Sequence, residues 1–251
     1  MKILVIGDAC EDVYVYGTCN RMAPEAPVPV FVKKHSKTNG GMALNVYNNL
    51  MSLGFECEVL HNESKNIKTR YVDHATNHLF IRIDSDESKT DRIDSKYLNK
   101  DFLLQHDAIV ISDYDKGFLT REDIEKICFY HPLTFMDTKK KLGRWSEGCK
   151  WIKINTPEYE NTAEYVQEKK YIYNESLIVT MGSAGCRYKS KIYPVDKVEI
   201  KDLSGAGDTF LAGLVYKYLN TSDIEEALNF ANRCATIVVQ QKGVNVLNGI
   251  K

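Results

Sequence analysis

The segment Asp202-Leu203-Ser204-Gly205-Ala206-Gly207-Asp208-Thr209-Phe210 carries the strongest local signal in the sequence. Apolar residues then recur at helical spacing as far as Leu219, so a helix is expected to begin at residues 205–207. Backbone N–H groups are unpaired at such a helix start, and small residues let a phosphate approach them closely. Asp208 would lie in the first turn, where a carboxylate can accept a proton from an attacking hydroxyl. The alternative is a carboxylate that only complements the helix dipole.

The rest of the chain alternates short apolar runs with helical patterns. Residues 2–7, 108–112, 133–137, 151–154 and 177–181 are apolar on both faces, which is typical of strands in a buried parallel sheet. Three expected helix starts have recognisable chemistry, namely Thr120 with Asp123, Thr156 with Pro157, and Ser222 with Glu225. The alternation predicts an α/β fold with a doubly wound, mostly parallel sheet flanked by helices.

Two regions, near residues 12–34 and 68–84, do not follow this alternation of strands and helices. Leu79, Ile81 and Ile83 alternate with more polar neighbours, as in a strand with two different faces. We therefore expect these regions to form a small antiparallel β lid beside the main sheet. No stretch rich in Gly, Pro or Ser separates two units, so the sequence predicts one domain over residues 1–251 that includes the lid.

The composition narrows the class of protein. The 251 residues include 33 Lys and Arg against 34 Asp and Glu, a formal net charge of −1, which argues against an electrostatic nucleic-acid binder. Seven scattered cysteines without a C-x-x-C pair favour reduced thiols and a cytoplasmic location. No apolar run approaches the roughly 18–20 residues of a membrane span. Neither nucleic acid nor a membrane is expected as a partner.

The glycine segment resembles the D-x-x-G-A-G-D-x-F signature of the pfkB, or ribokinase-like, carbohydrate kinases. Residues Asn39-Gly40-Gly41-Met42-Ala43-Leu44-Asn45 resemble that family's G-G-x-x-x-N signature, ahead of an expected helix that ends near Gly54. Its N-x-x-E and T-x-G-x-x-G motifs are matched by Asn155-Thr156-Pro157-Glu158 and by Thr180-Met181-Gly182-Ser183-Ala184-Gly185. The resemblance implies a ribokinase-like fold and an ATP-dependent carbohydrate kinase.

The resemblance implies roles for the matched residues around the nucleotide. Asp208 would accept the proton of the sugar hydroxyl, while the amides of Gly205, Ala206 and Gly207 stabilise charge on the transferring phosphoryl group. Mg²⁺ would bridge the ATP phosphates near Asn155 and Glu158, with Glu158 binding it through water. The remaining nucleotide-side residues would be Thr180, Gly182, Gly185 and Asn232, the last of them on a helix beside the adenine. Simpler interpretations are a helix-start carboxylate for Glu158 and a hairpin turn for the two glycines.

The resemblance also assigns residues to the sugar. Asp12 would accept hydrogen bonds from sugar hydroxyls, Gly40 and Gly41 would allow close backbone approach, and Asn45 would contact the sugar through its amide. Lys116 is a candidate cation near the sugar or its phosphate, although an exposed lysine that follows two acidic residues, Asp113 and Asp115, is also typical of a solvated surface.

The N-terminal residues narrow the resemblance further. Gly7-Asp8-Ala9-Cys10-Glu11-Asp12 and Arg21-Met22-Ala23-Pro24-Glu25-Ala26-Pro27-Val28-Pro29 are similar to the kinase domain of the bifunctional ADP-heptose synthesis enzymes, as are residues 112–117 and 137–139. This implies phosphorylation of D-glycero-D-manno-heptose 7-phosphate at O1, by a homodimer that pairs through its lids. The alternatives are a kinase for another sugar, of the fructose or ribose type, and a catalytically idle homologue that binds sugar or nucleotide.

The chain departs from this pattern in three places. Between residues 60 and 67 it has a short polar link where the family usually has a helix and a further strand, so one βα unit is expected to be missing near the sugar pocket. Lys140 stands where the subfamily tends to have glycine. No nucleotidyltransferase sequence follows Lys251, so we do not expect the second activity of the bifunctional enzymes from these residues.

Overall fold

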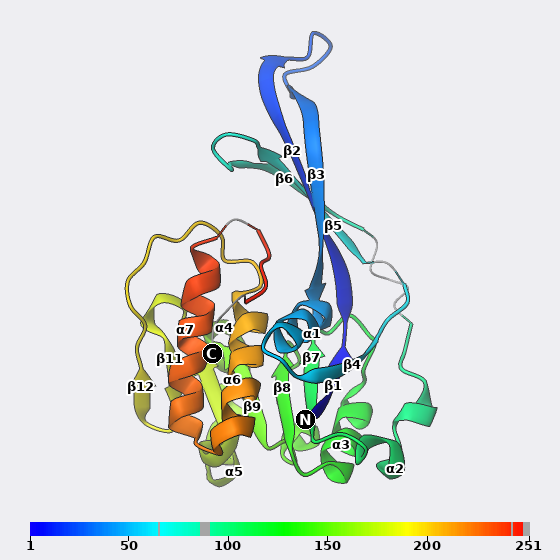
Figure 1. Cartoon of the computed structure of the whole chain (residues 1–251), viewed down its shortest axis with the longest axis vertical. Helices are drawn as coiled ribbons and strands as arrows, with labels where there is room; N and C mark the ends of the chain where they lie inside the picture. The colour runs from blue at the N-terminus through cyan, green and yellow to red at the C-terminus, as the bar shows by residue number, and fades with distance from the viewer. Residues whose placement is uncertain (65, 86–90, 242, 248–251) are drawn as a thin grey trace.

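The centre of the molecule is a sheet with strand order β12-β11-β10-β9-β8-β7-β1-β4 (Figure 1). The computed structural model describes residues 1–64, 66–85, 91–241 and 243–247. Neighbouring strands are parallel from β10 to β4, whereas β11 and β12 are antiparallel additions at one edge. The strands are β1 (Lys2–Gly7), β4 (Glu56–His61), β7 (Ala108–Asp113), β8 (Thr134–Thr138), β9 (Trp151–Asn155), β10 (Leu177–Thr180), β11 (Cys186–Tyr188) and β12 (Lys191–Tyr193).

Helices cover both faces of this sheet. Ile3 and Val5 of β1 belong to one hydrophobic core with α1 (Ala43–Ser52), α6 (Ala206–Thr221) and α7 (Ile224–Val239). Leu4 and Ile6 belong to a second core with α2 (Lys100–Leu103), α3 (Arg121–Tyr130), α4 (Thr156–Glu168) and α5 (Lys170–Ser176). Because alternate strand residues are buried on opposite faces, the expected doubly wound α/β fold is confirmed. Of the described helices, none is long and apolar enough to cross a membrane.

Side-chain caps fix where several helices begin. At the start of α3, Thr120 Oγ1 accepts the N–H of Asp123 at 3.2 Å, and Asp123 Oδ2 accepts the N–H of Thr120 at 2.9 Å, as expected from the sequence. The expectation that Ser222 caps the last helix is wrong. Ser222 ends α6 in the left-handed conformation, and Asp223 caps α7 by accepting two backbone N–H groups at 2.8 and 3.1 Å.

A second sheet, the lid, stands beyond the carboxyl ends of the parallel strands (Figure 1). Its strands are β2 (Ala9–Met22), β3 (Pro29–Met42), β5 (Ile67–Asp73) and β6 (Leu79–Asp84), in the order β3-β2-β5-β6. Both outer pairs are antiparallel, as expected, and the parallel pairing of β2 with β5 joins them. The expected small lid is confirmed, and its first two strands are longer than the segments expected from the sequence.

A short link connects the main sheet to the second half of the lid. Residues 62–66 lead from the edge strand β4 to β5, with residue 65 outside the described part of the chain. The carboxamide Oδ1 of Asn62 accepts the N–H of Ala9 at 2.7 Å, and the N–H of Glu11 donates to the carbonyl of Asn66 at 2.7 Å. These bonds fix the link to the first residues of β2.

Asp8, directly after β1, organises the loop that follows β7. Its side chain is almost completely buried, and its Oδ2 accepts the backbone N–H groups of Tyr114 at 2.8 Å and Lys116 at 3.2 Å. Its Oδ1 accepts the N–H of Phe118 at 3.2 Å. Because β1 and β7 are neighbours, one carboxylate at the end of β1 can hold the whole turn of residues 114–118.

Replacing Asp8 should therefore destabilise the fold. Asp8→Asn places an NH₂ donor among buried N–H groups, and each donor left unpaired costs roughly 1–3 kcal/mol, so we expect a loss of about 2–3 kcal/mol in the free energy of unfolding. Urea unfolding followed by circular dichroism measures this loss. Glu160→Gln, on the exposed side of α4, is the control and should change stability by less than about 0.5 kcal/mol. Equal effects of the two substitutions would contradict the role given to Asp8.

Candidate active site

The start of α6 has the geometry of an anion-binding turn. Gly205 precedes the helix with φ 79°, and a Cβ there would lie 2.6 Å from Asn45 Nδ2, so only glycine fits. The N–H of Ala206 makes a long hydrogen bond to the carbonyl of Leu203 at 3.3 Å, and the N–H of Gly207 donates to no other described residue. These amides lie at the positive end of the helix dipole and can bind an anion.

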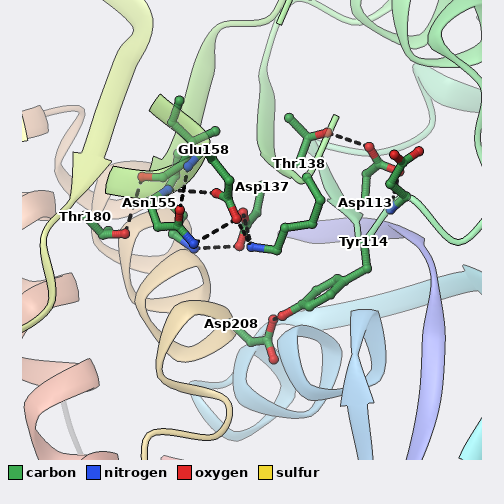
Figure 2. A network of polar contacts seen from close by, with 12 residues as sticks. Asp113, Tyr114, Asp137, Thr138, Asn155, Glu158, Thr180 and Asp208 are labelled. Atoms are coloured by element: carbon green, nitrogen blue, oxygen red, sulfur yellow. Dashed lines mark hydrogen bonds and ion pairs between the residues drawn. The ribbon is translucent and has the colours of Figure 1, made fainter. Parts of the chain in front are cut away.

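The carboxylate of Asp208, in the first turn of α6, is buried and held from two sides. Its Oδ2 accepts a hydrogen bond from Asn45 Nδ2 at 3.0 Å, and its Oδ1 accepts one from the hydroxyl of Tyr114 at 2.7 Å (Figure 2). Burial raises the pKa of Asp208 to about 6, and the hydrogen bonds from Asn45 and Tyr114 oppose this rise. A carboxyl group with this pKa is mostly ionised at pH 7 and remains basic enough to accept a proton.

A cavity of about 910 Å³ opens beside this helix start. Its volume is that of a typical small-molecule site. Eight of the residues predicted to contact the nucleotide or the phosphoryl group line this cavity: Asn155, Thr180, Gly182, Gly185, Gly205, Ala206, Gly207 and Asn232. Motifs that are far apart in the sequence thus meet at one cavity. Asp208 does not line the cavity itself. It accepts a hydrogen bond from Tyr114, which does line the cavity.

The glycines after β10 form part of the cavity wall and also a turn. Gly182 and Gly185 have φ of 58° and 87°, and a Cβ at Gly185 would lie 2.0 Å from the carbonyl oxygen of Tyr193. Because β10 and β11 are antiparallel neighbours, these residues also make the hairpin turn that was the simpler interpretation. The same carbonyl oxygen of Tyr193 accepts a hydrogen bond from Asn232 Nδ2 at 2.8 Å.

Two carboxylates and two ammonium groups gather in this region. Figure 2 shows Asp137 and Glu158 pointing toward one another beside Asn155. Glu158 Oε2 accepts the backbone N–H of Asn155 at 2.8 Å, and Asn155 Oδ1 accepts the N–H of Glu158 at 2.9 Å, so each fixes the other at the start of α4. Lys139 forms a short ion pair with Glu158, and Lys153 Nζ lies 2.6 Å from Asp137 Oδ2.

The resemblance implies Mg²⁺, and these residues fit such an ion. Asp137 Oδ1 is buried and accepts no hydrogen bond from the described residues, so it keeps a free acceptor position at the cavity. Within the described ranges, no group of three or more His, Cys, Asp or Glu side chains could hold a metal alone. Mg²⁺ is commonly held by one or two carboxylates, with substrate phosphates and water completing its octahedron. The donor set around Glu158 and Asp137 corresponds to that pattern.

The predicted sugar residues lie where the lid meets the main sheet. Asp12 is buried and forms a short ion pair with Arg70 of β5. A Cβ at Gly41 would lie 2.3 Å from Asp12 Oδ2, so glycine is required for this close approach. A Cβ at Gly40 would meet the Leu44 side chain at 2.8 Å, which is a packing requirement of the chain itself.

Two further residues predicted for the sugar, Asn45 and Lys116, have other partners. The amide of Asn45 is directed at Asp208 and at the carbonyl of Gly205, the latter at 3.4 Å. Lys116 is on the loop after β7, where its backbone N–H donates to Asp8. The structure therefore brings Asn45 to the candidate base, where it orients the carboxylate.

Four residues that line the cavity and belong to the network of charges received no role from the sequence: Tyr114, Asp137, Lys139 and Lys153. Lys153 had a detectable signal, because it is a charged residue inside the apolar run of β9 and is buried there. Tyr114 directly follows β7, and Asp137 is near the carboxyl end of β8, which is the edge at which parallel sheets bind ligands. Their contacts depend on which strands are neighbours, and that information is not in the local sequence.

Comparison with known proteins gives matches over most of the chain. Residues 56–248 match the pfkB family carbohydrate kinase. The bifunctional protein HldE of a Nitratiruptor species is 30% identical over 292 residues, covering 96% of this chain and 62% of that protein. The chain thus spans less than two thirds of this relative. The 292 aligned positions also exceed the 251 residues of the chain, so the alignment contains positions of the relative that have no counterpart here.

Solved structures share the fold at low sequence identity. Phosphofructokinase-2 from Escherichia coli superposes with a TM-score of 0.74 at 12% identity, covering 98% of this chain and 95% of that chain. Ribokinase from Arabidopsis thaliana, complexed with ribose and ATP, has a TM-score of 0.68 at 13% identity and covers 96% and 93%. These likenesses confirm the ribokinase-like fold. The expectation of an ATP-dependent carbohydrate kinase is confirmed at the level of the family, since the chain belongs to the pfkB family of carbohydrate kinases.

Proposed function

We propose that this protein transfers the γ-phosphoryl group of ATP to a sugar phosphate, D-glycero-D-manno-heptose 7-phosphate, at O1. The observation that carries the proposal is the buried Asp208 carboxylate, which lies next to the backbone amides at the start of α6 and beside a nucleotide-sized cavity. The choice of sugar is supported by the HldE relatives and by the N-terminal residues quoted above. The choice of ATP is supported by the family and by the ribokinase structure that holds ribose and ATP.

The proposed reaction needs a base, a positioned phosphoryl group and charge stabilisation. Asp208 takes the proton from the O1 hydroxyl as this oxygen forms a bond to the γ-phosphorus. The bond from phosphorus to the oxygen that bridges to the β-phosphate breaks, and ADP leaves with that oxygen. Amides of Gly205, Ala206 and Gly207 bind the equatorial oxygens of the group in transfer. When Mg²⁺ is bound near Glu158, it neutralises phosphate charge.

The acceptor side is proposed to keep the sugar close to Asp208. Asp12, oriented by Arg70, accepts hydrogen bonds from sugar hydroxyls, while Gly40 and Gly41 let the sugar approach the backbone. Lys116 is proposed to lie near the sugar or its phosphate. In the nucleotide site, Thr180, Gly182, Gly185 and Asn232 are proposed to contact ATP, as cavity-lining residues. A cytoplasmic location is proposed on the basis of the seven free cysteines.

Phosphorus NMR of the purified protein with Mg-ATP and a panel of sugars tests this function. The panel contains the heptose 7-phosphate, fructose 6-phosphate, ribose and fructose. We expect an anomeric phosphate signal with the heptose, and a rate about 10²–10⁴-fold lower for Asp208→Asn, because the base is lost. Signal only with another sugar would assign the protein to that sugar. Intact ATP with every sugar, combined with calorimetric binding of sugar or nucleotide, would favour an idle binding homologue.

The pH dependence of the rate should follow the ionisation of Asp208. With a pKa of about 6, the rate is expected to fall about tenfold for each pH unit below that value, because only the carboxylate can accept the proton. The hydrogen bond from Tyr114 stabilises the charged form, so Tyr114→Phe should move the acid limb of the profile to higher pH. Carbon NMR of the Asp208 carboxyl group checks the same shift without turnover. An unchanged titration in Tyr114→Phe would contradict this assignment.

A homodimer through the lid is proposed from the exposed apolar side chains of β6. Leu79, Ile81 and Ile83 are 48–54% exposed and alternate along this edge strand of the lid. Ile81 and Ile83 pair in register with Tyr71 and Thr69, on the face opposite to the side chain of Arg70 that binds Asp12. An apolar edge of this kind is covered in most proteins, and a second lid would cover it.

Light scattering after size-exclusion chromatography tests the dimer. The unmodified protein is expected to elute as a dimer at micromolar concentration, and Ile81→Lys is expected to elute as a monomer, because a charge would be buried at the interface. Phe129→Lys, at a side chain that is 81% exposed on α3, is the matched control and should remain dimeric. A monomeric unmodified protein would contradict the proposal.

A further inference from the structure

The ammonium group of Lys139 lies between two carboxylates, that of Asp137 on the cavity wall and that of Glu158 at the start of α4. Its Nζ forms a short ion pair with Glu158 Oε1 and lies 3.9 Å from Asp137 Oδ1. Figure 2 shows these two carboxylates approaching one another from different elements, β8 and the start of α4. A cation is therefore already placed at the point where the two side chains converge.

Only one of the two carboxylate oxygens of Asp137 has a close partner in this arrangement. Its Oδ2 is 2.6 Å from Lys153 Nζ, whereas its Oδ1 accepts no hydrogen bond from the described residues. The Asp137 side chain is 2% exposed, and a buried carboxylate oxygen that accepts no hydrogen bond is costly. An oxygen in this state, on the wall of the cavity, is suited to bind a cation directly.

The side chains of Lys153 and Lys139 differ in how tightly the protein encloses them. The Lys153 side chain is 3% exposed and inside β9, and a Cβ at Gly207 would lie 2.9 Å from its Nζ, so it is enclosed. Both lysines line the cavity, but the Lys139 side chain is 31% exposed, and its Nζ lies 5.2 Å from the centre of the Tyr114 ring.

We propose that Lys139 occupies the metal position in the nucleotide-free protein and exchanges places with Mg²⁺ when Mg-ATP binds. Lys139 then moves to the nucleotide phosphates, and Mg²⁺ contacts Asp137 Oδ1 directly while Glu158 binds it through water. The inference rests on the proposed function only in taking Mg-ATP as the ligand.

The balance of charge supports the exchange. The carboxylates of Asp137 and Glu158 are each paired with an ammonium group, so the charges of these four groups cancel and Lys139 repels a metal ion that arrives alone. ATP brings negative charge that attracts an ammonium group, and Mg²⁺ prefers carboxylate and phosphate oxygens. When ATP and Mg²⁺ bind together, the Lys139 ammonium group can contact phosphate oxygens while Mg²⁺ binds carboxylate and phosphate oxygens. The metal should therefore bind the free protein weakly and the nucleotide-bound protein well.

Titration of Mn²⁺ into nucleotide-free protein, followed by electron paramagnetic resonance, tests the exchange. Mn²⁺ reports the site because it prefers the same oxygen ligands as Mg²⁺. Lys139→Met is expected to bind Mn²⁺ about tenfold tighter than the unmodified protein, because a competing positive charge is removed. The same variant is expected to bind a fluorescent ATP analogue with Mg²⁺ about tenfold weaker, because a phosphate contact is lost. Lys141→Met, an exposed lysine two residues away, is the control and should change neither affinity.

A second variant tests Asp137 as the direct ligand. Asp137→Asn alone would leave Lys153 buried without its counter-charge, so Asp137→Asn and Lys153→Met are introduced together in the Lys139→Met protein. Loss of the gained Mn²⁺ affinity is expected. Removing the second ammonium should otherwise favour Mn²⁺, so undiminished affinity would exclude Asp137 as a ligand. Circular dichroism melting curves confirm that each variant is folded before it is titrated.

Opposite shifts in metal and nucleotide affinity distinguish this role from a structural one. A Lys139→Met protein in which Mn²⁺ affinity is unchanged or weaker, or in which ATP affinity is unchanged, would overturn the exchange. Neither titration contains an acceptor sugar. If opposite shifts occur and no sugar is phosphorylated, the proposed function fails and the inference stands. If the heptose 7-phosphate is phosphorylated and the shifts are absent, the inference fails alone.

Discussion

The site depends on keeping one carboxylate, that of Asp208, buried and yet able to ionise. A chain of amides supplies part of the compensation: the N–H of Leu247 donates to Asn49 Oδ1 at 2.9 Å, Asn49 Nδ2 donates to Asn45 Oδ1 at 3.0 Å, and Asn45 Nδ2 donates to Asp208. This chain fixes which way the Asn45 amide points, because its oxygen is already engaged. Asn45 can then present only its NH₂ group to the carboxylate. Tyr114 supplies the other donor from the opposite side.

The order of strands explains how these donors reach Asp208. Because β1 lies next to β7, the carboxylate of Asp8 can hold the turn that carries Tyr114 against the sheet. The register of β8 with β9 places Asp137 directly opposite Lys153, so their ion pair is a consequence of strand pairing. Buried charges of this kind persist only with partners in fixed positions. The parallel sheet therefore orders the charged groups of the site as well as supporting it.

The sequence predicted most of the fold and only part of the site, for a physical reason. Local patterns determine where a strand or helix forms, and the glycine segment with its helix start at residue 205 was recognised in this way. Tyr114 and Lys153 could not be assigned, because their partners Asp208 and Asp137 are distant in sequence and meet only through strand order and register. The expectation that Ser222 caps α7 was wrong for a local reason. Ser222 and Asp223 are adjacent and both are good capping residues, and in the structure Asp223 caps the helix.

The short link between β4 and β5 raises the question of how the lid keeps its position without a further strand beside it. Asn62 and Asn66 are both 3% exposed, and Asn62 both accepts from and donates to the backbone of Ala9, at 2.7 and 3.2 Å. The side-chain amide of Asn62 thus makes hydrogen bonds with the backbone at the start of β2 that a neighbouring strand would otherwise make. From there the pairing of β2 with β5 continues to Gly17, and the ion pair of Asp12 with Arg70 lies within it. The position of the lid therefore depends on hydrogen bonds within the lid and between its base and the link of residues 62–66.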